Sequence, residues 1–346
     1  AAFPRRKVCG CCLSSAALGQ LDALGLSDLP DALNAVPLTH LLWAAGKRRA
    51  SLPTPSGVSI SREALDDALV REAVARGAEF LPETQAVLDH HEPTPTPTSH
   101  RQIILEQHGV QADCRAKIIL AANGLAGRSF AHPGEQNVRV SPSSRVGAGT
   151  VFDDAPEEFA PGVIYMACHR EGYLGLVRLE DGRLDVAGAF APEMLKREGG
   201  PARSAELMLA GVDFPGLPQS AAAIWKGTPK LTHRPRRLFA PGVFLIGDAA
   251  GYVEPFTGEG VAWALASGRA AAPLALTAVE QGTDRLGPRW ERTHRRMVGR
   301  RILVCRAVSG LLRFSRTTAC VVGILSRMPA LAVPIVRSIN APLLAR

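Results

Sequence analysis

The sequence predicts an α/β fold in which a parallel sheet with helices is interrupted by an antiparallel sheet and followed by a helical carboxy-terminal region. Two short, fully apolar runs, 118–121 and 243–246, are typical of strands buried in a parallel sheet. Between them, residues 145–190 contain short alternating segments rich in Gly, Val and Tyr, which indicate antiparallel strands. We therefore expect two structural domains in one chain, the first interrupted by the second.

Four segments follow from this pattern. Residues 1–144 and 229–282 are expected to build the α/β domain, 145–228 the antiparallel sheet and 283–346 an arginine-rich helical region.

Individual elements can be predicted along the chain. Leu65, Leu69 and Val70 form one apolar face of a predicted helix. Ser61 is a plausible N-cap for this helix, which is expected to end near Gly77. Other elements are predicted from periodicity and breakers: helices over 14–26 and 260–279, a hairpin turn at 180–183, an exposed proline–threonine loop at 90–100, and two or three helices over 289–345 separated near 315 and 328–329. Pro273 predicts a kink or break in the helix that begins at Gly260.

Composition excludes several classes of protein. The chain has 346 residues, 46% hydrophobic and 21% charged, which is enough to bury one large core or two. Seven cysteines without paired Cys-x-x-Cys spacing predict reduced thiols and no metal site. The first residues do not have the pattern of a signal peptide, and no apolar run of about 18 residues occurs, so a cytoplasmic protein is expected.

Positive charge is concentrated at the carboxy-terminal end. Of the net charge of +8, residues 285–346 carry +12 through 13 arginines and one acid, Glu291. Such a segment is suited to anionic lipid, nucleic acid or another protein, although solvated helix faces would give the same composition. Few aromatic residues and no nucleic-acid signature accompany the arginines, so we expect no nucleic-acid partner. Apolar patches alternate with the arginines, which leaves peripheral membrane contact open.

The stretch "GDAAGYVEPFTGEG" (247–260) carries the most specific chemistry. Asp248 follows an apolar strand, at the edge where open α/β sheets bind ligands, and its carboxylate can accept hydrogen bonds from polyol hydroxyls. The small residues let a ligand lie against the backbone. The free N–H groups from Gly258 to Val261 begin a helix, whose positive end favours an anion. A strand–helix joint packed with glycines would look the same from these residues alone.

Four motifs in order resemble the geranylgeranyl-reductase-like group of glutathione-reductase-type FAD oxidoreductases, which are related to the aromatic hydroxylases and flavin halogenases. The segment "GVFLIGDAAGYVEPFTGEGVAWALASGRAAA" resembles their second flavin motif, "FPRRKVCGCCLS" their Arg-x-Lys-x-Cys-Gly segment, "SREALDDAL" their Arg-x-x-(Leu/Phe)-Asp-x-x-Leu element and "IILAANGLAGR" their third motif. The resemblance covers roughly residues 3–272. It implies an FAD/NAD(P)-binding Rossmann-like domain.

The resemblance also implies roles for individual residues. Asp248 would bind the ribityl chain of FAD, and Gly260 and Val261 would give backbone contacts to the isoalloxazine ring, while Gly258 would belong to the cofactor-binding loop. The remaining implied contacts with the cofactor are Cys9, Gly10, Cys12 and Arg62. Tyr173 and Gly175 would belong to the sheet that roofs the substrate pocket.

Two departures from the family pattern bear on cofactor binding. The Gly-x-Gly-x-x-Gly turn and the acid that binds the adenosine ribose are absent from the printed sequence, so we expect an N-terminally incomplete FAD domain that binds FAD weakly or not at all. Asn123 stands where the third motif usually has Asp, and it supplies hydrogen bonds without charge.

The resemblance implies an FAD-dependent oxidoreductase that transfers hydride to, or oxidises, a hydrophobic isoprenoid- or polyketide-like molecule, with NAD(P)H as a candidate electron donor. An FAD-dependent monooxygenase of aromatic compounds shares the same motifs. A non-catalytic remnant that binds a lipid or a partner is a third interpretation.

Two further groups of side chains could do chemistry. Cys9 could form a disulfide with Cys11 or Cys12, or an adduct with the flavin. Close packing of Cys9 on the cofactor is the favoured role. His169 could act as a general acid, whereas an exposed hairpin position is the simpler interpretation.

Overall fold

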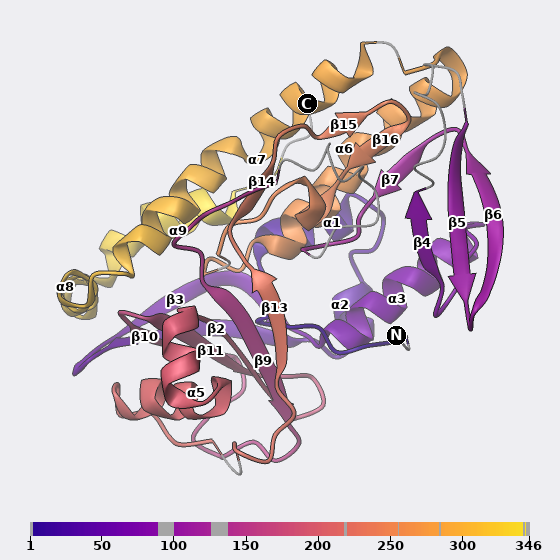
Figure 1. The fold of residues 1–346 in the computed structure, drawn as a ribbon. Helices are drawn as coiled ribbons and strands as arrows, with labels where there is room; N and C mark the ends of the chain where they lie inside the picture. Colours follow the sequence, from indigo (N-terminus) through magenta and orange to yellow (C-terminus); the bar gives the residue numbers. More distant parts are fainter. Residues whose placement is uncertain are drawn as a thin grey trace.

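The structure, a computed structural model, describes residues 3–88, 100–125, 138–217, 220–254, 256–283, 285–341 and 343. It contains a large curved sheet, a smaller sheet with parallel strands, and long carboxy-terminal helices that lie across both (Figure 1). Most of the proline–threonine segment predicted as a loop lies outside the described residues.

The large sheet has eight strands in the order β1-β3-β2-β10-β11-β12-β9-β13. Neighbours pair antiparallel except β2 and β10, which are parallel. The strands are β1 (Cys12–Leu13), β2 (Val36–Ala45), β3 (Arg48–Ser59), β9 (Val146–Phe152), β10 (Val163–His169), β11 (Gly172–Arg178), β12 (Leu184–Phe190) and β13 (Lys226–Lys230). The sheet therefore joins strands from both sides of the boundary predicted at residue 144. The hairpin predicted at 180–183 connects β11 and β12, and is confirmed.

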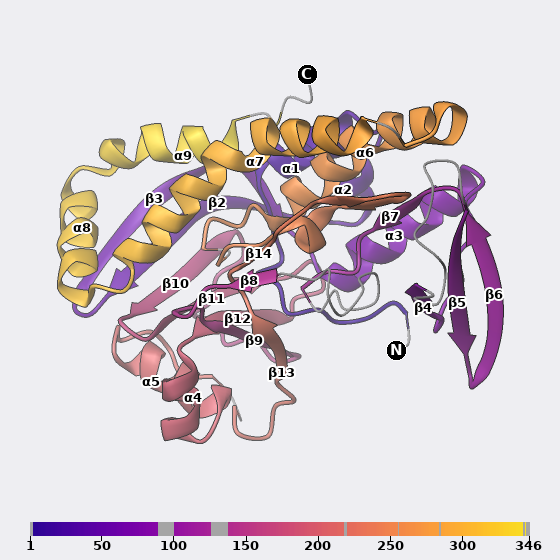
Figure 2. The ribbon, with the colours of Figure 1, turned by 45° about the horizontal axis from the view of Figure 1, so that its top comes forward.

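Side chains alternate along each strand, so the sheet presents apolar residues on both of its faces. Helices cover both faces. One face, with Trp43, Met166 and Tyr173, packs against the carboxy-terminal helices. The opposite face, with Ala167 and Leu174, packs against the short helices α4 (Pro192–Glu198) and α5 (Pro201–Ala210). Figure 2 shows these helices on opposite sides of the sheet.

The smaller sheet has the order β15-β16-β7. Strands β7 (Ile119–Ala121) and β16 (Val243–Leu245) are parallel, as the two apolar runs predict, and β15 (Phe239–Ala240) is antiparallel to β16. Beside this sheet, Phe244 and Ile246 share a hydrophobic core with two helices. These are the first helix, α1 (Ser15–Asp22), and the long helix rich in small residues, α6 (Gly260–Gln281). The remaining strands are β4 (Gln85–Leu88), β5 (Arg101–Gln107) and β6 (Val110–Ala116), which form a separate antiparallel sheet, and the pair β8 (Val138–Val140) and β14 (His233–Pro235).

Helix boundaries follow the local signals. The predicted helix after Ser61 is α3 (Arg62–Ala75), and the Ser61 hydroxyl caps it by accepting from the Ala64 N–H at 3.1 Å. Pro273 lies inside the single helix α6, so the predicted break does not occur there. A four-residue helix, α2 (Leu29–Ala32), follows α1.

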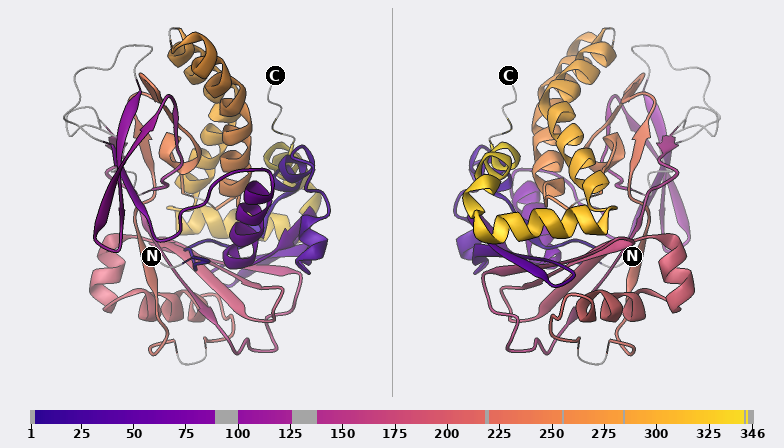
Figure 3. Two further views of the ribbon diagram at one scale, coloured as in Figure 1. Left: turned by 90° about the vertical axis from the view of Figure 1, so that its right-hand side faces the viewer. Right: turned by 90° about the vertical axis from the view of Figure 1, so that its left-hand side faces the viewer.

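The carboxy-terminal region forms helices on the outside of both sheets (Figure 3). Its elements are α7 (Leu286–Leu311), α8 (Ser315–Arg327), the 3-10 turn η2 (Pro329–Ala332) and α9 (Val333–Asn340), with the breaks where the sequence places them. In the described part of the chain no single helix is long and apolar enough to cross a membrane, but α7 and α8 together meet that criterion with a bend of 108°.

Candidate functional site

The turn that follows β16 places an acid at the carboxyl end of the parallel sheet. It is a 3-10 turn, η1 (Gly247–Ala250), and Gly247 adopts φ 57°, a left-handed conformation that favours glycine. The Gly247 N–H donates to the Ser267 hydroxyl of α6 at 2.7 Å, which fixes the turn on the helix. Asp248 is thereby held at the edge where the sheet and the start of α6 meet.

The Asp248 carboxylate has no hydrogen bond or ion pair to the residues that the structure describes. Burial raises its pKa, while the nearby Arg62 guanidinium opposes that shift. A carboxylate that is largely removed from water needs hydrogen-bond donors. Ligand hydroxyl groups would supply them.

Open space lies beside the glycines implied in cofactor contact. A Cβ atom at Gly10 or Gly258 would meet no atom within 4 Å, and at Gly260 it would approach the Tyr252 ring at 3.7 Å. Gly260 and Val261 form the first turn of α6, where backbone N–H groups lack partners inside the helix. This cradle of bare backbone fits a flat ligand with an anionic edge.

Cys9 is the cysteine of this region whose thiol pKa is lowered rather than raised. The Cys11 thiol donates a hydrogen bond to it and the Arg62 guanidinium attracts its charge, which together lower the pKa of Cys9 to about 5 against the opposing effect of burial. Cys11, whose own pKa is raised well above its usual range, supplies that hydrogen bond, so it acts on Cys9 although the sequence singled it out only as a possible redox partner. Cys12 lies in β1, and burial raises its pKa.

Arg62 is held by protein groups. Its Nε and Nη2 atoms both donate to the Asp66 carboxylate, at 3.0 and 2.8 Å, and Lys7 binds the same carboxylate at 2.6 Å. The structure thus brings Arg62 together with Cys9 and Asp248, but it commits much of the guanidinium to Asp66. Its contact with a cofactor phosphate stays a prediction.

Asn123 has unused hydrogen-bonding capacity. It follows β7, the strand beside β16, and both side-chain polar atoms, Oδ1 and Nδ2, are buried without a partner among the described residues. Buried amides are normally paired, so this position indicates a missing ligand or water.

The two residues predicted to roof a substrate pocket lie on β11. Tyr173 is 4% exposed, and its ring packs edge-on against Phe256 in the turn before α6, with centroids 5.2 Å apart. Gly175 lies two positions along the same strand and therefore on the same face. The Tyr173 hydroxyl has no partner in the described chain, and burial raises its pKa well above the usual range, so the phenol stays protonated.

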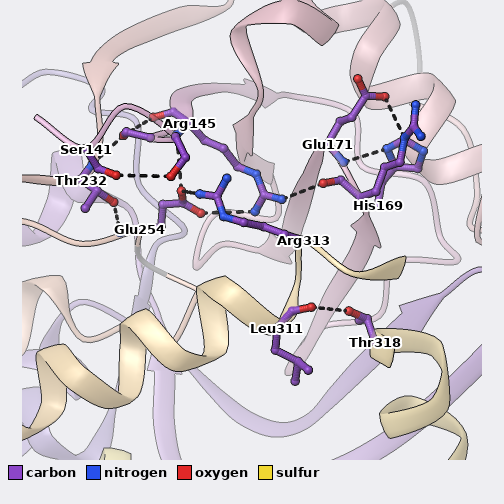
Figure 4. A network of polar contacts seen from close by, with 12 residues as sticks. Ser141, Arg145, His169, Glu171, Thr232, Glu254, Leu311, Arg313 and Thr318 are labelled. Atoms are coloured by element: carbon purple, nitrogen blue, oxygen red, sulfur yellow. Dashed lines mark hydrogen bonds and ion pairs between the residues drawn. The ribbon is translucent and has the colours of Figure 1, made fainter. Parts of the chain in front are cut away.

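A buried ionic network lies beside Tyr173, and sequence reasoning missed it (Figure 4). Glu254, 1% exposed, accepts from Arg145 Nη1 at 3.3 Å and from Arg313 Nη2 at 2.9 Å. Arg145 is equally buried; its Nη2 donates to the Arg170 carbonyl at 3.0 Å and its guanidinium lies 5.8 Å from the Tyr173 ring centroid. The two glutamates inside the flavin-like motif were the available signal, since acids within an apolar stretch usually have cationic partners.

The second glutamate of the turn is also paired with an arginine of α7. Glu259, 1% exposed, binds Arg301 at 2.5 Å, and the Cys305 thiol lies 3.7 Å from its other oxygen. A small cavity beside this pair is lined by residues of the turn, α6 and α7: Tyr252, Val253, Glu254, Thr257, Glu259, Gly260, Trp263 and Cys305. Helix α7 is therefore part of the site's surroundings.

His169 lies at the end of β10 near this network, half-buried, and its Nδ1 atom accepts from the Glu171 N–H at 3.3 Å. Burial lowers its pKa, so it is a neutral imidazole near neutral pH. Among the described residues, no group of His, Cys, Asp or Glu side chains has the arrangement of a metal site.

Two proteins of known name are similar in sequence to this chain. No family model matches the chain. Menaquinone reductase of Mycobacterium tuberculosis is 26% identical over 301 residues, which are 79% of this chain and 68% of that protein. Digeranylgeranylglycerophospholipid reductase of Methanoculleus marisnigri is 26% identical over 257 residues, which are 69% of this chain and 63% of that protein. The chain therefore spans about two thirds of the length of these relatives.

A solved structure shares the fold. PqsL, a probable FAD-dependent monooxygenase from Pseudomonas aeruginosa, superimposes with a TM-score of 0.68 at 17% identity, over 92% of this chain and 90% of that one. The chain is thus similar in sequence to two enzymes named as reductases and similar in fold to a probable FAD-dependent monooxygenase, as expected for an FAD oxidoreductase like the geranylgeranyl reductases. This confirms both the resemblance and the fold class predicted from the motifs.

For a geranylgeranyl-reductase-like chain, the site residues fit FAD. The largely buried Asp248 carboxylate, the unpaired Asn123 amide and the open backbone at Gly10 and Gly258 all lie on segments that carry the family motifs. The roles implied for Cys9, Cys12, Arg62, Val261 and the other contact residues remain predictions residue by residue.

Proposed function

We propose that this chain is an FAD-dependent oxidoreductase that acts on a hydrophobic, isoprenoid-like small molecule. The observation that carries the proposal is the pairing of Asp248 with the bare backbone at the start of α6, at the carboxyl end of a parallel strand pair. FAD bound there would supply reversible hydride transfer. The names of the two reductase relatives support a reductive direction and a lipid-like substrate.

Each residue of the site then has a defined task. Asp248 accepts hydrogen bonds from ribityl hydroxyls, and the N–H groups of Gly260 and Val261 stabilise negative charge at the ring edge. Tyr173 would offer a protonated phenol whose hydroxyl has no partner among the described residues, next to Phe256. Its Oη atom can donate a hydrogen bond to a polar group of the substrate, while the aromatic surroundings exclude water.

A monooxygenase is the second candidate, and the structural likeness to a probable FAD-dependent monooxygenase favours it. The two reactions separate in one assay with FAD, NADPH and a quinone or polyprenyl substrate. Substrate reduction without oxygen supports the reductase, whereas oxygen uptake with hydroxylated product supports the monooxygenase.

Cofactor binding is the first test. The residues present surround the ribityl and ring portion, so for purified residues 1–346 we expect FMN and FAD to bind with similar, weak affinity. Titration is followed by flavin fluorescence and by absorbance near 450 nm. Stoichiometric FAD retained through purification would contradict the expected weak binding, while leaving the oxidoreductase proposal intact.

The matched variants are Asp248→Asn and Asp213→Asn. Loss of a charged acceptor at Asp248 should weaken binding of both flavins by roughly 10- to 100-fold, since a hydrogen bond to a charged group contributes about 1.5–3 kcal/mol. Asp213, whose side chain is 99% exposed, should leave binding unchanged. If neither flavin binds to this chain or to one extended by its upstream codons, the oxidoreductase proposal fails and the non-catalytic interpretation is favoured.

A further inference from the structure

Five arginines of the carboxy-terminal region illustrate two different environments. Arg301 and Arg313 turn inward and bind the buried acids Glu259 and Glu254. Arg306, Arg316 and Arg327 are exposed, and none of them has an ion pair to the part of the chain that the structure describes. From residue 292 to the end the sequence contains no acid, so neighbouring side chains of this segment cannot neutralise them.

Helix α8 separates its inner and outer faces cleanly. Its buried residues Thr318, Val322 and Leu325 lie on the side that contacts β3 and β2. Residues 316, 317, 320, 324 and 327 are exposed and share the opposite side of the helix, since they fall within one arc at 3.6 residues per turn.

This outer side is apolar as well as cationic. Ile324, in the middle of this outer side, is 46% exposed. Large apolar residues lie at both ends of α8: Phe314, 66% exposed, precedes the helix, and Met328 and Leu331, 56% and 51% exposed, follow it. We call these four residues with Arg316, Cys320 and Arg327 the α8 outer face. Exposed aromatic and aliphatic side chains interleaved with arginines that lack an ion pair are typical of surfaces that lie on lipid.

We propose that the α8 outer face docks onto an anionic phospholipid surface, with Phe314, Ile324, Met328 and Leu331 entering the headgroup boundary and Arg316 and Arg327 binding lipid phosphates. Charge complementarity selects this occupant: guanidinium groups without a carboxylate partner favour phosphate, and a lipid surface also buries the apolar residues between them. The 108° bend between α7 and α8 is compatible with a helix lying in the surface plane. This docking is independent of the flavin chemistry.

The test is flotation of the chain 1–346 with vesicles of phosphatidylglycerol mixed with phosphatidylcholine, and with vesicles of phosphatidylcholine alone. We expect the chain to float with the anionic vesicles at low salt and to be released at about 1 M salt, where the screening length is about 3 Å. Equal binding to both vesicles, or no flotation at low salt, overturns the proposal.

Two pairs of variants separate charge from apolar contact. Arg316→Gln with Arg327→Gln should weaken partitioning about 30-fold, from about fivefold per arginine. The control is Arg115→Gln with Lys117→Gln, exposed cations on and beside β6, which lies at the far end of the molecule from α8 (Figures 1 and 2). Variants and control have the same net charge, so equal weakening of both means non-specific attraction and overturns the docking face.

The apolar pair is Phe314→Ser with Ile324→Ser, which should weaken partitioning about tenfold or more. Its control is Leu207→Ser with Ile224→Ser, exposed apolar residues in and after α5 that are 40% and 82% exposed and should have no effect. Circular dichroism melting shows that each variant is folded before flotation is compared.

Cys320 gives a direct readout of contact, because it is exposed and lies on the α8 outer face. In a chain carrying Cys9→Ser, an environment-sensitive fluorophore attached at Cys320 and located by peptide mass spectrometry should shift its emission to shorter wavelength on anionic vesicles. Unchanged emission on vesicles that carry the protein, or tighter binding to a DNA duplex than to vesicles, would assign this surface to another partner and overturn the proposal.

Discussion

Glu254 is the acid whose removal we expect to cost this protein most stability. Three groups donate to its carboxylate: Arg313 Nη2 at 2.9 Å, Arg145 Nη1 at 3.3 Å and the Arg145 backbone N–H at 3.4 Å. The substitution Glu254→Gln keeps the shape but removes the charge. It leaves Arg145, a guanidinium 2% exposed, without its counter-ion and close to a second cation.

The size of the effect follows from burial. Breaking a buried ion pair by removing one partner costs about 3–5 kcal/mol, because the remaining charge stays buried and uncompensated. Arg313 is 33% exposed, so water can solvate it when it loses its partner. We therefore expect Arg313→Gln to cost only about 1 kcal/mol. Asp213→Asn removes a solvent-exposed pair with Arg49 and should change stability by no more than about 0.5 kcal/mol.

Urea unfolding measures these differences, followed by far-ultraviolet circular dichroism and by the fluorescence of the four tryptophans. The double variant Arg145→Gln with Glu254→Gln should lose clearly less free energy of unfolding than the sum of the two single losses. In the double variant, the buried Arg145–Glu254 pair is replaced by two neutral side chains, so neither position keeps a buried charge without its partner. A loss below about 1 kcal/mol for Glu254→Gln, or additive losses in the double variant, would refute the assignment of Glu254 as a buried counter-ion.

Two further predictions concern titration. Alkylation of Cys9 by iodoacetamide should rise through about pH 5 and then level off, because its thiolate forms there, and Cys11→Ala should move this midpoint upward; a rate that still climbs toward pH 9 would contradict the shift. His294, packed on Trp290, has a pKa lowered by burial to about 4, so the unfolded chain binds a proton between pH 6.5 and 4 that the folded chain does not. Stability should therefore fall by about 3 kcal/mol as pH decreases through that window, and His294→Gln should flatten this dependence; equal slopes in both proteins would exclude it.

Local signals were enough to predict much of the fold. Ser61 caps α3, the apolar runs at 119–121 and 243–245 pair in parallel, and the carboxy-terminal helices break at the predicted positions. The cap and the helix breaks depend on neighbours within a few residues of sequence, and the apolar runs predict buried strands of a parallel sheet without showing which strand each one pairs with. Pro273 predicted a kink or a break, and the break is absent because α6 continues through it; the packing of α6 against α1 supports this continuation at the cost of one hydrogen bond.

Long-range pairing was beyond the sequence. Strands β2 and β10 are parallel neighbours although more than a hundred residues separate them, so the large sheet crosses the boundary that composition suggested at residue 144. Alternation along a strand predicts its faces but not its neighbour. For the same reason the sequence placed Tyr173 in the sheet without showing that Phe256 and Arg145 meet it there.

The arginine count shows how a correct composition can conceal two different roles. Thirteen arginines in residues 285–346 predicted either a basic surface for a partner or a set of solvated helix faces. The structure instead assigns Arg301 and Arg313 to the turn that carries the flavin-like motif, where each neutralises a buried glutamate. Because that turn contains both acids and leads into α6, α7 and the link between α7 and α8 hold it in place through charge. Variants made to test the α8 outer face must therefore leave Arg301 and Arg313 unchanged, since a loss at either would disturb the flavin turn and the outer surface together.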